Sequence, residues 1–171
     1  LGNKVLLIDN DLKRGELNKR FNVKKISKDK FYNINKENID EFKVDENLHF
    51  IPKVSRLKSS FQFLYEPAYK QFIKTFEKDF DIILFDSPPV LASSDTSILV
   101  SMSDVNLIVI RHEINKINEI KQVNKLFAQF QKNIDGYIYN SYEKPSGYYG
   151  YYGLYGNYSY QYYAQKYLYD G

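Results

Sequence analysis

Five short runs of apolar residues recur along the chain, and their spacing predicts a sheet. The runs occupy residues 5–8, 48–51, 82–85, 105–110 and 134–139. Each run is almost continuously apolar rather than alternating, which is typical of strands buried on both faces of a parallel sheet. We therefore predict five strands, most of them parallel.

Two longer segments between these runs have the periodicity of amphipathic helices. The first covers residues 66–79 and the second residues 115–132. Their apolar positions are Ala68, Phe72, Ile73, Phe76 and Phe80 in or next to the first, and Ile117, Ile120, Val123, Phe127 and Phe130 in the second. Buried strands that alternate with helices predict an α/β fold, with a mostly parallel sheet and helices on both faces. We interpret Leu1 and Gly2 as the end of a helix that starts before this sequence.

Two of the predicted strands end in aspartate. VLLIDND places Asp9 and Asp11 after the first strand, and IILFDSPP places Asp86 after the third. Ligands of open parallel sheets bind beyond the carboxyl ends of the strands, where carboxylates can hold Mg²⁺ beside a phosphate. We interpret the three acids as a metal and phosphate site. The alternative is that each aspartate caps the helix that follows it.

Composition narrows the classes of function. The chain has no cysteine, which excludes disulfides and thiolate chemistry within it, and its two histidines are too few for a metal cluster. No apolar run approaches the length of a membrane-spanning helix. The net charge of +3 is too small to indicate nucleic acid as a partner. Residues 13–30 hold eight Lys or Arg, which we interpret as a solvated face or as a contact for an anionic membrane or a phosphorylated tail.

The end of the chain differs from the rest. Residues 145–171 contain eleven of the 17 tyrosines and five of the eight glycines, with few aliphatic residues. We predict a mobile tail there, after a folded domain at residues 1–144, because glycine raises the cost of ordering and little apolar surface offsets it. The alternative is a low-complexity segment that only self-associates. The tyrosines are Tyr148, Tyr149, Tyr151, Tyr152, Tyr155, Tyr158, Tyr160, Tyr162, Tyr163, Tyr167 and Tyr169.

Nearly the whole chain resembles a known family. VLLIDNDLKRG resembles the secondary Walker motif of the bacterial tyrosine kinases, the Wzc-type kinases of capsule and exopolysaccharide export. FDIILFDSPPVLASSDTSILVSMSD resembles their Walker B segment and the stretch after it, and the closing tyrosine cluster is similar to their autophosphorylated tail. The resemblance implies a P-loop NTPase-like fold of the deviant Walker type, which the partition and septum-positioning ATPases share.

The resemblance also implies roles for matching residues. Asp9 would lie near the metal and the tyrosine hydroxyl as a candidate base, Asp11 would support the metal, and Asp86 would hold Mg²⁺ through water. These three would form the catalytic and metal-binding set. The remaining implied positions are Asp95 behind the site, Arg111 and Asn140 at the nucleotide, and the eleven tail tyrosines as phosphate acceptors. The family's secondary motif reads D-x-D-x-R, whereas this chain has Lys13 at the last position and Arg14 after it.

From the resemblance we expect ATP and Mg²⁺ as cofactors and phosphorylation between copies in a homo-oligomer. Further expected partners are a membrane polysaccharide co-polymerase segment or adaptor and a cognate tyrosine phosphatase. The expected location is the cytoplasm, at the inner face of the plasma membrane. The sequence contains no G-x-x-x-x-G-K-[ST] segment, so we expect the P-loop upstream of Leu1 and no kinase activity from these 171 residues alone.

Two other functions remain open from the sequence. A partition-type ATPase would share the Walker-like segments, but the tyrosine-rich tail argues against it. A non-catalytic phosphoacceptor or interaction module would need no P-loop, and it would gain phosphate only when an intact kinase is supplied.

Overall fold

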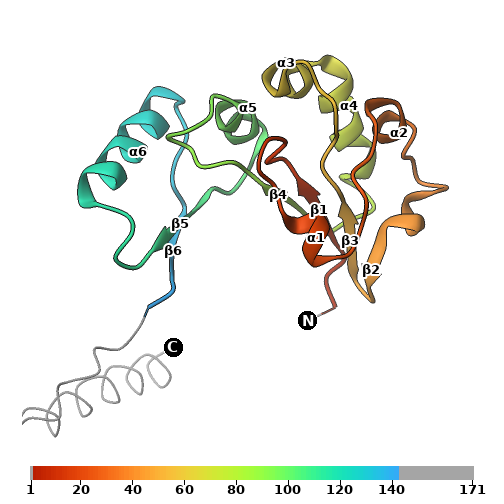
Figure 1. Cartoon of the computed structure of the whole chain (residues 1–171), viewed down its shortest axis with the longest axis horizontal. Coiled ribbons are helices and arrows are strands. Elements are labelled where there is room, and N and C mark those ends of the chain that lie inside the picture. The colour runs from red at the N-terminus through yellow and green to blue at the C-terminus, as the bar shows by residue number, and fades with distance from the viewer. Residues whose placement is uncertain (1, 143–171) are drawn as a thin grey trace, which may run out of the picture.

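Two groups of strands, joined through one helix, make up the described part of the chain (Figure 1). The structure is a computed structural model, and it describes residues 2–142. The predicted mobile tail at 145–171, with its eleven tyrosines, lies outside the described residues.

The first group is a four-stranded sheet in the order β2-β3-β1-β4. β1 (Val5–Asp9) lies between β3 (Leu48–Ile51) and β4 (Ile82–Asp86) and is parallel to both. The central place suits β1, because four consecutive apolar residues can bury both of its faces. β2 (Lys43–Asp45) is antiparallel to β3 at the edge of the sheet.

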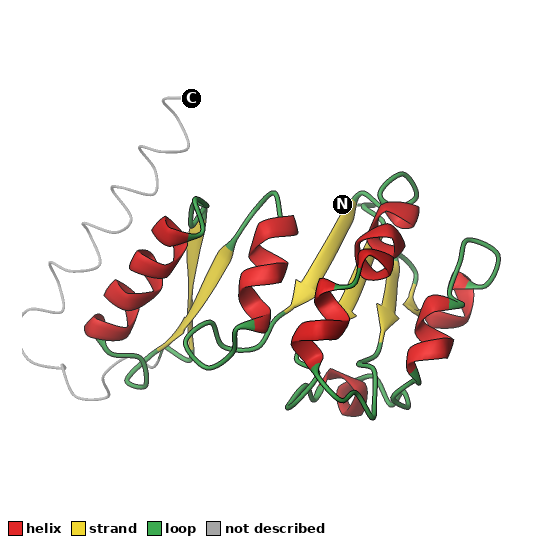
Figure 2. Ribbon diagram, turned by 90° about the horizontal axis from the view of Figure 1, so that it is seen from above, coloured by secondary structure: helices red, strands yellow, loops and turns green. Residues whose placement is uncertain are grey.

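The second group is a parallel pair, β5 (Leu107–Arg111) and β6 (Gly136–Asn140). Both strands begin two residues later than predicted, at 107 and 136 rather than 105 and 134. The five predicted strands and the mostly parallel α/β class are confirmed. In the described residues, however, the strands form two sheets rather than one, because no hydrogen-bond ladder joins β4 to β5. Figure 2 shows the two groups of strands from above.

The two predicted helices correspond to α4 (Pro67–Phe76) and α6 (Ile117–Gln129). The structure adds α1 (Leu17–Arg20), α2 (Lys28–Tyr32), a 3-10 turn η1 (Ile39–Phe42), α3 (Ser60–Tyr65) and α5 (Asp95–Met102). These pieces are too short to show a helical repeat in the sequence. Within residues 2–142, no helix is both long and apolar enough to cross a membrane.

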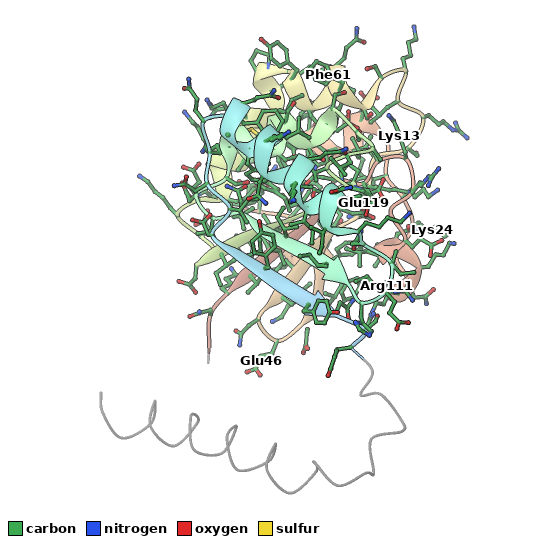
Figure 3. The ribbon with its side chains drawn as sticks, turned by 90° about the vertical axis from the view of Figure 1, so that its left-hand side faces the viewer. Lys13, Lys24, Glu46, Phe61, Arg111 and Glu119 are labelled. Atoms are coloured by element: carbon green, nitrogen blue, oxygen red, sulfur yellow. The ribbon has the colours of Figure 1, made fainter. Side chains whose placement is uncertain are left out.

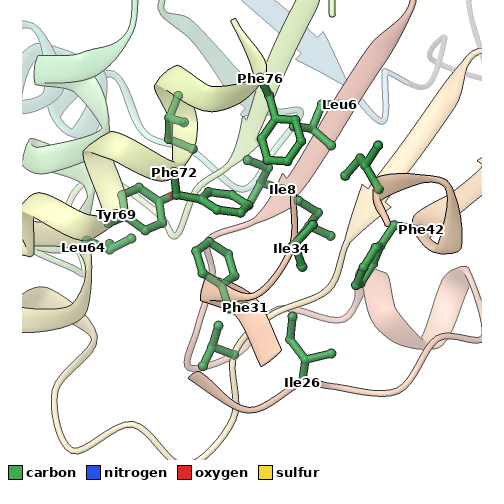
Figure 4. Packing of buried hydrophobic residues seen from close by; sticks show 14 of the residues in the cluster. Leu6, Ile8, Ile26, Phe31, Ile34, Phe42, Leu64, Tyr69, Phe72 and Phe76 are labelled. Atoms are coloured by element: carbon green, nitrogen blue, oxygen red, sulfur yellow. The ribbon is translucent and has the colours of Figure 1, made fainter. Parts of the chain in front are cut away.

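Aromatic side chains fill the core between the four-stranded sheet and helices α2, α3 and α4 (Figure 4). Phe31 packs against Phe63, Tyr69 and Phe72, with ring centroids 4.2–5.8 Å apart. Edge-to-face and offset pairs of this kind add to the free energy gained from burial alone. A smaller cluster holds α6 on the second sheet through Val123 and Phe127.

The opposite face of the four-stranded sheet is covered unevenly. Phe50 on β3 is fully buried beneath Phe21, whose ring centroid lies 4.6 Å away. Leu7 on β1 is half-buried, and its partner Leu84 on β4 is 50% exposed. Leu107 and Val109 on β5 are exposed as well. Among the described residues, helical cover on this face therefore ends before β4.

Candidate functional site

The carboxyl ends of β1 and β4 meet, and each ends in aspartate. Asp9 and Asp86 are register partners on these neighbouring parallel strands. The backbone N–H of Asn10 donates a hydrogen bond of 2.8 Å to the carbonyl oxygen of Asp86, which extends the pairing past the strand ends. The two acids come together because both strands run in the same direction and end in the same register.

Asp9 is a buried carboxylate without a hydrogen-bond partner. It is 1% exposed, and neither carboxylate oxygen accepts a hydrogen bond within the described residues. Burial, followed by the nearby charge of Asp86, raises the pKa of Asp9 to about 6, although Lys53 opposes the increase. Burial also raises the pKa of Asp86, with a smaller contribution from Asp11. Both carboxyls therefore bind a proton more readily than an exposed aspartate does.

Asp11 and Asp86 face a cavity of about 500 Å³ that is also lined by Arg14, Lys19 and Arg20. The carboxylate of Asp11 accepts a 2.8 Å hydrogen bond from the backbone N–H of Arg14, which closes the turn after β1. This turn presents Arg14 on the same side as the two acids. Glu16 lines the cavity too and pairs with Lys19 at 2.6 Å. An anion in the cavity would therefore meet three cationic side chains beside three carboxylates, with Arg14 and Arg20 as the cations that this ion pair does not occupy.

Lys13 and Asp95 lie at a different cavity. This second cavity measures about 450 Å³ and is lined by residues that follow β1 and β3 and precede α5. Asp95 is 2% exposed at the start of α5, and the exposed Lys13 does not line the cavity that holds Asp11 and Asp86. Of the two basic residues that follow the acidic motif, only Arg14 therefore shares a cavity with its acids.

Arg111 and Asn140 are brought together on the second sheet. They are register partners at the carboxyl ends of β5 and β6, and both are exposed. The side chain of Asn115 accepts from the backbone N–H of Arg111 at 2.8 Å. Figure 3 shows Arg111 at the end of β5, on the side of the molecule where Lys13 also lies. Neither Arg111 nor Asn140 lines the two cavities described above.

Three residues of this region were not predicted from the sequence. Lys53 follows β3 and is 5% exposed, Asn10 is 1% exposed, and Gly15 packs against Asp9. Lys53 could have been found, because it comes directly after an apolar run and Pro52 and so lies at the same sheet edge as the acids.

The acids fit a Mg²⁺ ion that is shared with a phosphate, rather than an ion held by protein groups alone. Asp9 offers two unpaired oxygens, and Asp86 stands opposite it. Residues 2–142 contain no cluster of three acidic or histidine side chains arranged to hold a metal by themselves. Mg²⁺ usually keeps several waters and takes one or two carboxylates together with substrate phosphates. Asp9 and Asp86 would supply those carboxylates.

Comparison with known proteins identifies the family. The family model described as AAA domain matches residues 1–139. Tyrosine-protein kinase EpsB of Ralstonia solanacearum is 30% identical over 148 residues, which are 82% of this chain and 19% of that protein. The chain belongs to the AAA domain family, and this curated relative is a bacterial tyrosine-protein kinase. The predicted resemblance is confirmed.

A second relative agrees with this family. The tyrosine-protein kinase in the cps region of Klebsiella pneumoniae is 32% identical over 148 residues, which are 84% of this chain and 20% of that protein. The chain thus spans about a fifth of the length of the curated relatives that it matches.

Solved structures show the same fold. The kinase domain of the Escherichia coli tyrosine kinase ETK aligns with a TM-score of 0.73 at 23% identity, covering 87% of this chain and 61% of that one. A ParA family ATPase from Chlorobium tepidum aligns with a TM-score of 0.62 at 17% identity, covering 81% of this chain and 60% of that one. The predicted P-loop NTPase-like fold is therefore confirmed for this chain.

Proposed function

We propose that this domain is part of a protein-tyrosine kinase that transfers the terminal phosphoryl group of Mg-ATP to tyrosines in its own C-terminal segment. The observation that carries the proposal is the pairing of Asp9 with Asp86. The two acids stand in register on adjacent strands, and Asp9 keeps two buried oxygens without partners. The names of the relatives supply the class of reaction.

Asp9 is suited to accept the proton of the attacking tyrosine hydroxyl. A free tyrosine has a pKa near ~10, so attack on a phosphoryl group is helped by a base. A general base works best when its pKa lies near the working pH, and the raised value of about 6 brings Asp9 closer to neutrality. A Mg²⁺ ion bound with ATP would offset the negative charge of the phosphates.

The remaining predicted residues take supporting roles in this proposal. Asp86 and Asp11 would hold a Mg²⁺ ion through its waters, and Arg14 would attract phosphate oxygens in the cavity that it shares with these two acids. Arg111 and Asn140 would approach the nucleotide from the end of the second sheet. Phosphoryl transfer depends mainly on positioning and on the stabilisation of charge, which these groups can supply.

We further propose that the acceptors are the eleven tyrosines of residues 145–171 and that they are phosphorylated between copies of the protein. A kinase that works on a polysaccharide co-polymerase would act in the cytoplasm, at the inner face of the membrane, and a phosphatase would reset its tail. The proposal is that phosphorylation of the tail regulates capsule or exopolysaccharide export.

The test uses the native gene product that contains these 171 residues. The purified protein is incubated with Mg-ATP, and phosphotyrosine is mapped by mass spectrometry. We expect phosphate on tyrosines between 148 and 169. Asp86→Asn should lower the rate by at least about a hundredfold, because a group that contributes to charge stabilisation typically supplies 10² or more. Asp104→Asn, an exposed acid far along the chain, is the matched control.

Absence of phosphotyrosine in the wild-type protein, or an equal loss in both variants, would overturn the kinase proposal. A non-catalytic phosphoacceptor is the second candidate, and the lack of a G-x-x-x-x-G-K-[ST] segment in these residues favours it. In that case, phosphate would appear on the tail only after an intact bacterial tyrosine kinase is added, and Asp86→Asn would not change the rate.

A further inference from the structure

The cavity beside Lys13 is strongly basic. Five cationic side chains line it, against one carboxylate, that of the buried Asp95. The cations are Lys13, Lys25, Lys53, Arg56 and Lys58. Within residues 2–142, no carboxylate lies within 4.0 Å of any of these five cationic groups. The cavity therefore concentrates positive charge that the described residues do not neutralise by direct pairing.

Lys53 is the unusual member of this group, because it is buried. The residue is 5% exposed, and its ammonium group makes one long hydrogen bond of 3.5 Å to the carbonyl oxygen of Lys13. A buried ammonium is costly unless an anion or several good acceptors surround it. Asp9 acts on Lys53 only through its charge and not as a direct partner. The floor of the cavity therefore holds a cation that is suited to bind an incoming anion.

The backbone holds the rim of the cavity in place. An isolated bridge between Ile26 and Val54 joins the segment of Lys25 to the loop of residues 53–58. The backbone N–H of Ser55 donates to the carbonyl oxygen of Ile26 at 2.8 Å, and the hydroxyl of Ser55 donates to the same oxygen at 3.1 Å. Arg56 has a φ of 60°, a conformation that few non-glycine residues adopt. These contacts hold together the two backbone segments that carry Lys25, Arg56 and Lys58.

The wall of the cavity is partly apolar. Leu12, Leu57 and Phe61 line it together with the basic residues. Phe61 is 39% exposed, and its ring stacks on Tyr65 with a centroid distance of 6.0 Å, which leaves ring surface open to a ligand. Lys13 and Phe61 are both marked in Figure 3. A ligand that fits both surfaces carries an anionic group next to an apolar or aromatic part.

We propose that this cavity binds phosphotyrosine, and that its ligand is a phosphorylated tyrosine of residues 145–171. The phosphate would contact Lys53, Arg56 and Lys58, and the ring would pack against Leu57 and Phe61. A volume of about 450 Å³ is within the usual range for small-ligand sites. The proposal rests on the proposed function only for the source of the phosphate, because the cavity recognises the group however it was added.

The chemistry of the C-terminal segment suits this cavity only after phosphorylation. Residues 145–171 carry one lysine, Lys166, and one acid, Asp170, so the unmodified segment has no net charge. Each phosphate adds roughly −1.5 to −2 charges. A membrane surface is less suitable as a ligand, because Lys53 is buried in a concave site that a flat bilayer does not enter. Binding would keep a modified tyrosine close to the site of Asp9 while another tyrosine is phosphorylated.

The test measures binding of synthetic peptides of residues 145–171 to the 171-residue chain by fluorescence anisotropy. One peptide carries phosphotyrosine at positions 151 and 152, a second is unmodified, and a third has phosphoserine at the same positions. We expect the phosphotyrosine peptide to bind at least about tenfold more tightly than the unmodified one, because charge-assisted hydrogen bonds are the strong ones. It should also bind more tightly than the phosphoserine peptide.

Two variants and one control locate the binding site. Arg56→Gln with Lys58→Gln should weaken binding of the phosphotyrosine peptide about tenfold, whereas Lys121→Gln with Lys125→Gln removes the same charge from exposed α6 positions and should not. Phe61→Ala should weaken the phosphotyrosine peptide but leave the phosphoserine peptide unchanged.

Three results would overturn the proposal. They are equal affinity for modified and unmodified peptides, equal losses in the cavity and control variants, and displacement of the peptide by phosphatidylserine vesicles or by inorganic phosphate at equal concentration. Because the phosphate is introduced by synthesis, these results do not depend on kinase activity. A failure here is therefore distinct from a failure of the proposed function.

Discussion

Gly15 lies directly against the carboxylate of Asp9. A Cβ atom built at Gly15 would fall 2.2 Å from Oδ1 of Asp9 and 2.6 Å from the carbonyl oxygen of Asp11. Both distances are far below van der Waals contact, so no other residue fits without movement of the turn. The glycine of LKRG thus allows the loop after β1 to fold back over the acid at the strand end.

Gly15→Ala should therefore destabilise the domain by about 1–3 kcal/mol, which is typical of overpacking at a tight site. Urea unfolding followed by circular dichroism measures the change in the free energy of unfolding. Gly136→Ala is the control, because its Cβ would meet only the end of the Leu107 side chain, at 3.1 Å. The expectation fails if the two substitutions cost the same.

Asp9 should make stability depend on pH. Its folded pKa of about 6 lies above its ordinary value of 3.8. The folded state therefore binds the proton more tightly, and this contribution to stability is present below about pH 4 and is lost as the pH rises to about 6. A shift of this size corresponds to at most about 3 kcal/mol. Asp9→Asn should remove this loss of stability with rising pH.

The measurement compares the free energy of unfolding of wild type and Asp9→Asn at pH 4, 5, 6 and 7. We expect the variant to gain about 1–3 kcal/mol relative to wild type between pH 4 and pH 7. For the exposed acid variant Asp104→Asn, the free energy of unfolding should change with pH in the same way as for wild type. A constant difference between Asp9→Asn and wild type would show that Asp9 has an ordinary pKa.

Tyr69 anchors the residue next to Asp9. The side-chain amide of Asn10 donates a 2.6 Å hydrogen bond to the Tyr69 hydroxyl, and both residues are buried. Tyr69→Phe should cost about 1–3 kcal/mol of stability, because it leaves the buried amide without its partner. Thermal and urea unfolding test this. Tyr65→Phe, at a site that is 73% exposed, should change stability by less than about 0.5 kcal/mol.

Phosphorylation of the tail should loosen an oligomer of the native protein. The basic cavity has room for one phosphotyrosine, so the remaining phosphates on the segment would repel one another across neighbouring copies, with roughly −1.5 to −2 charges for each. Sedimentation of the phosphorylated and phosphatase-treated protein at equal concentration measures the effect. We expect a smaller assembly in the phosphorylated sample. A variant with all eleven tail tyrosines replaced by phenylalanine should respond to neither treatment.

Much of the fold could be predicted from the sequence, because its strands are short and strongly apolar. The run at Val5–Asp9 and the runs of β3 and β4 were found at nearly their true positions. The helices α2 and α3 were not predicted, since pieces of five and six residues are too short to establish a helical period. They are held in place by the aromatic packing around Phe31 and Phe63, which joins distant parts of the chain.

The sequence by itself determined that Asp9 and Asp86 each end a strand, because an apolar run followed by an acid is a local pattern; the structure placed the two strands side by side. Only the tertiary structure decided that Arg14 shares a cavity with Asp86 while Lys13 lines another, and that Lys53, which also lines that other cavity, is buried. Which cavity a side chain lines depends on the side of the turn on which that side chain lies. The side is set by the packing of Gly15 against Asp9 and by the bridge between Ile26 and Val54. Local sequence patterns do not encode these contacts, because they depend on how the chain folds.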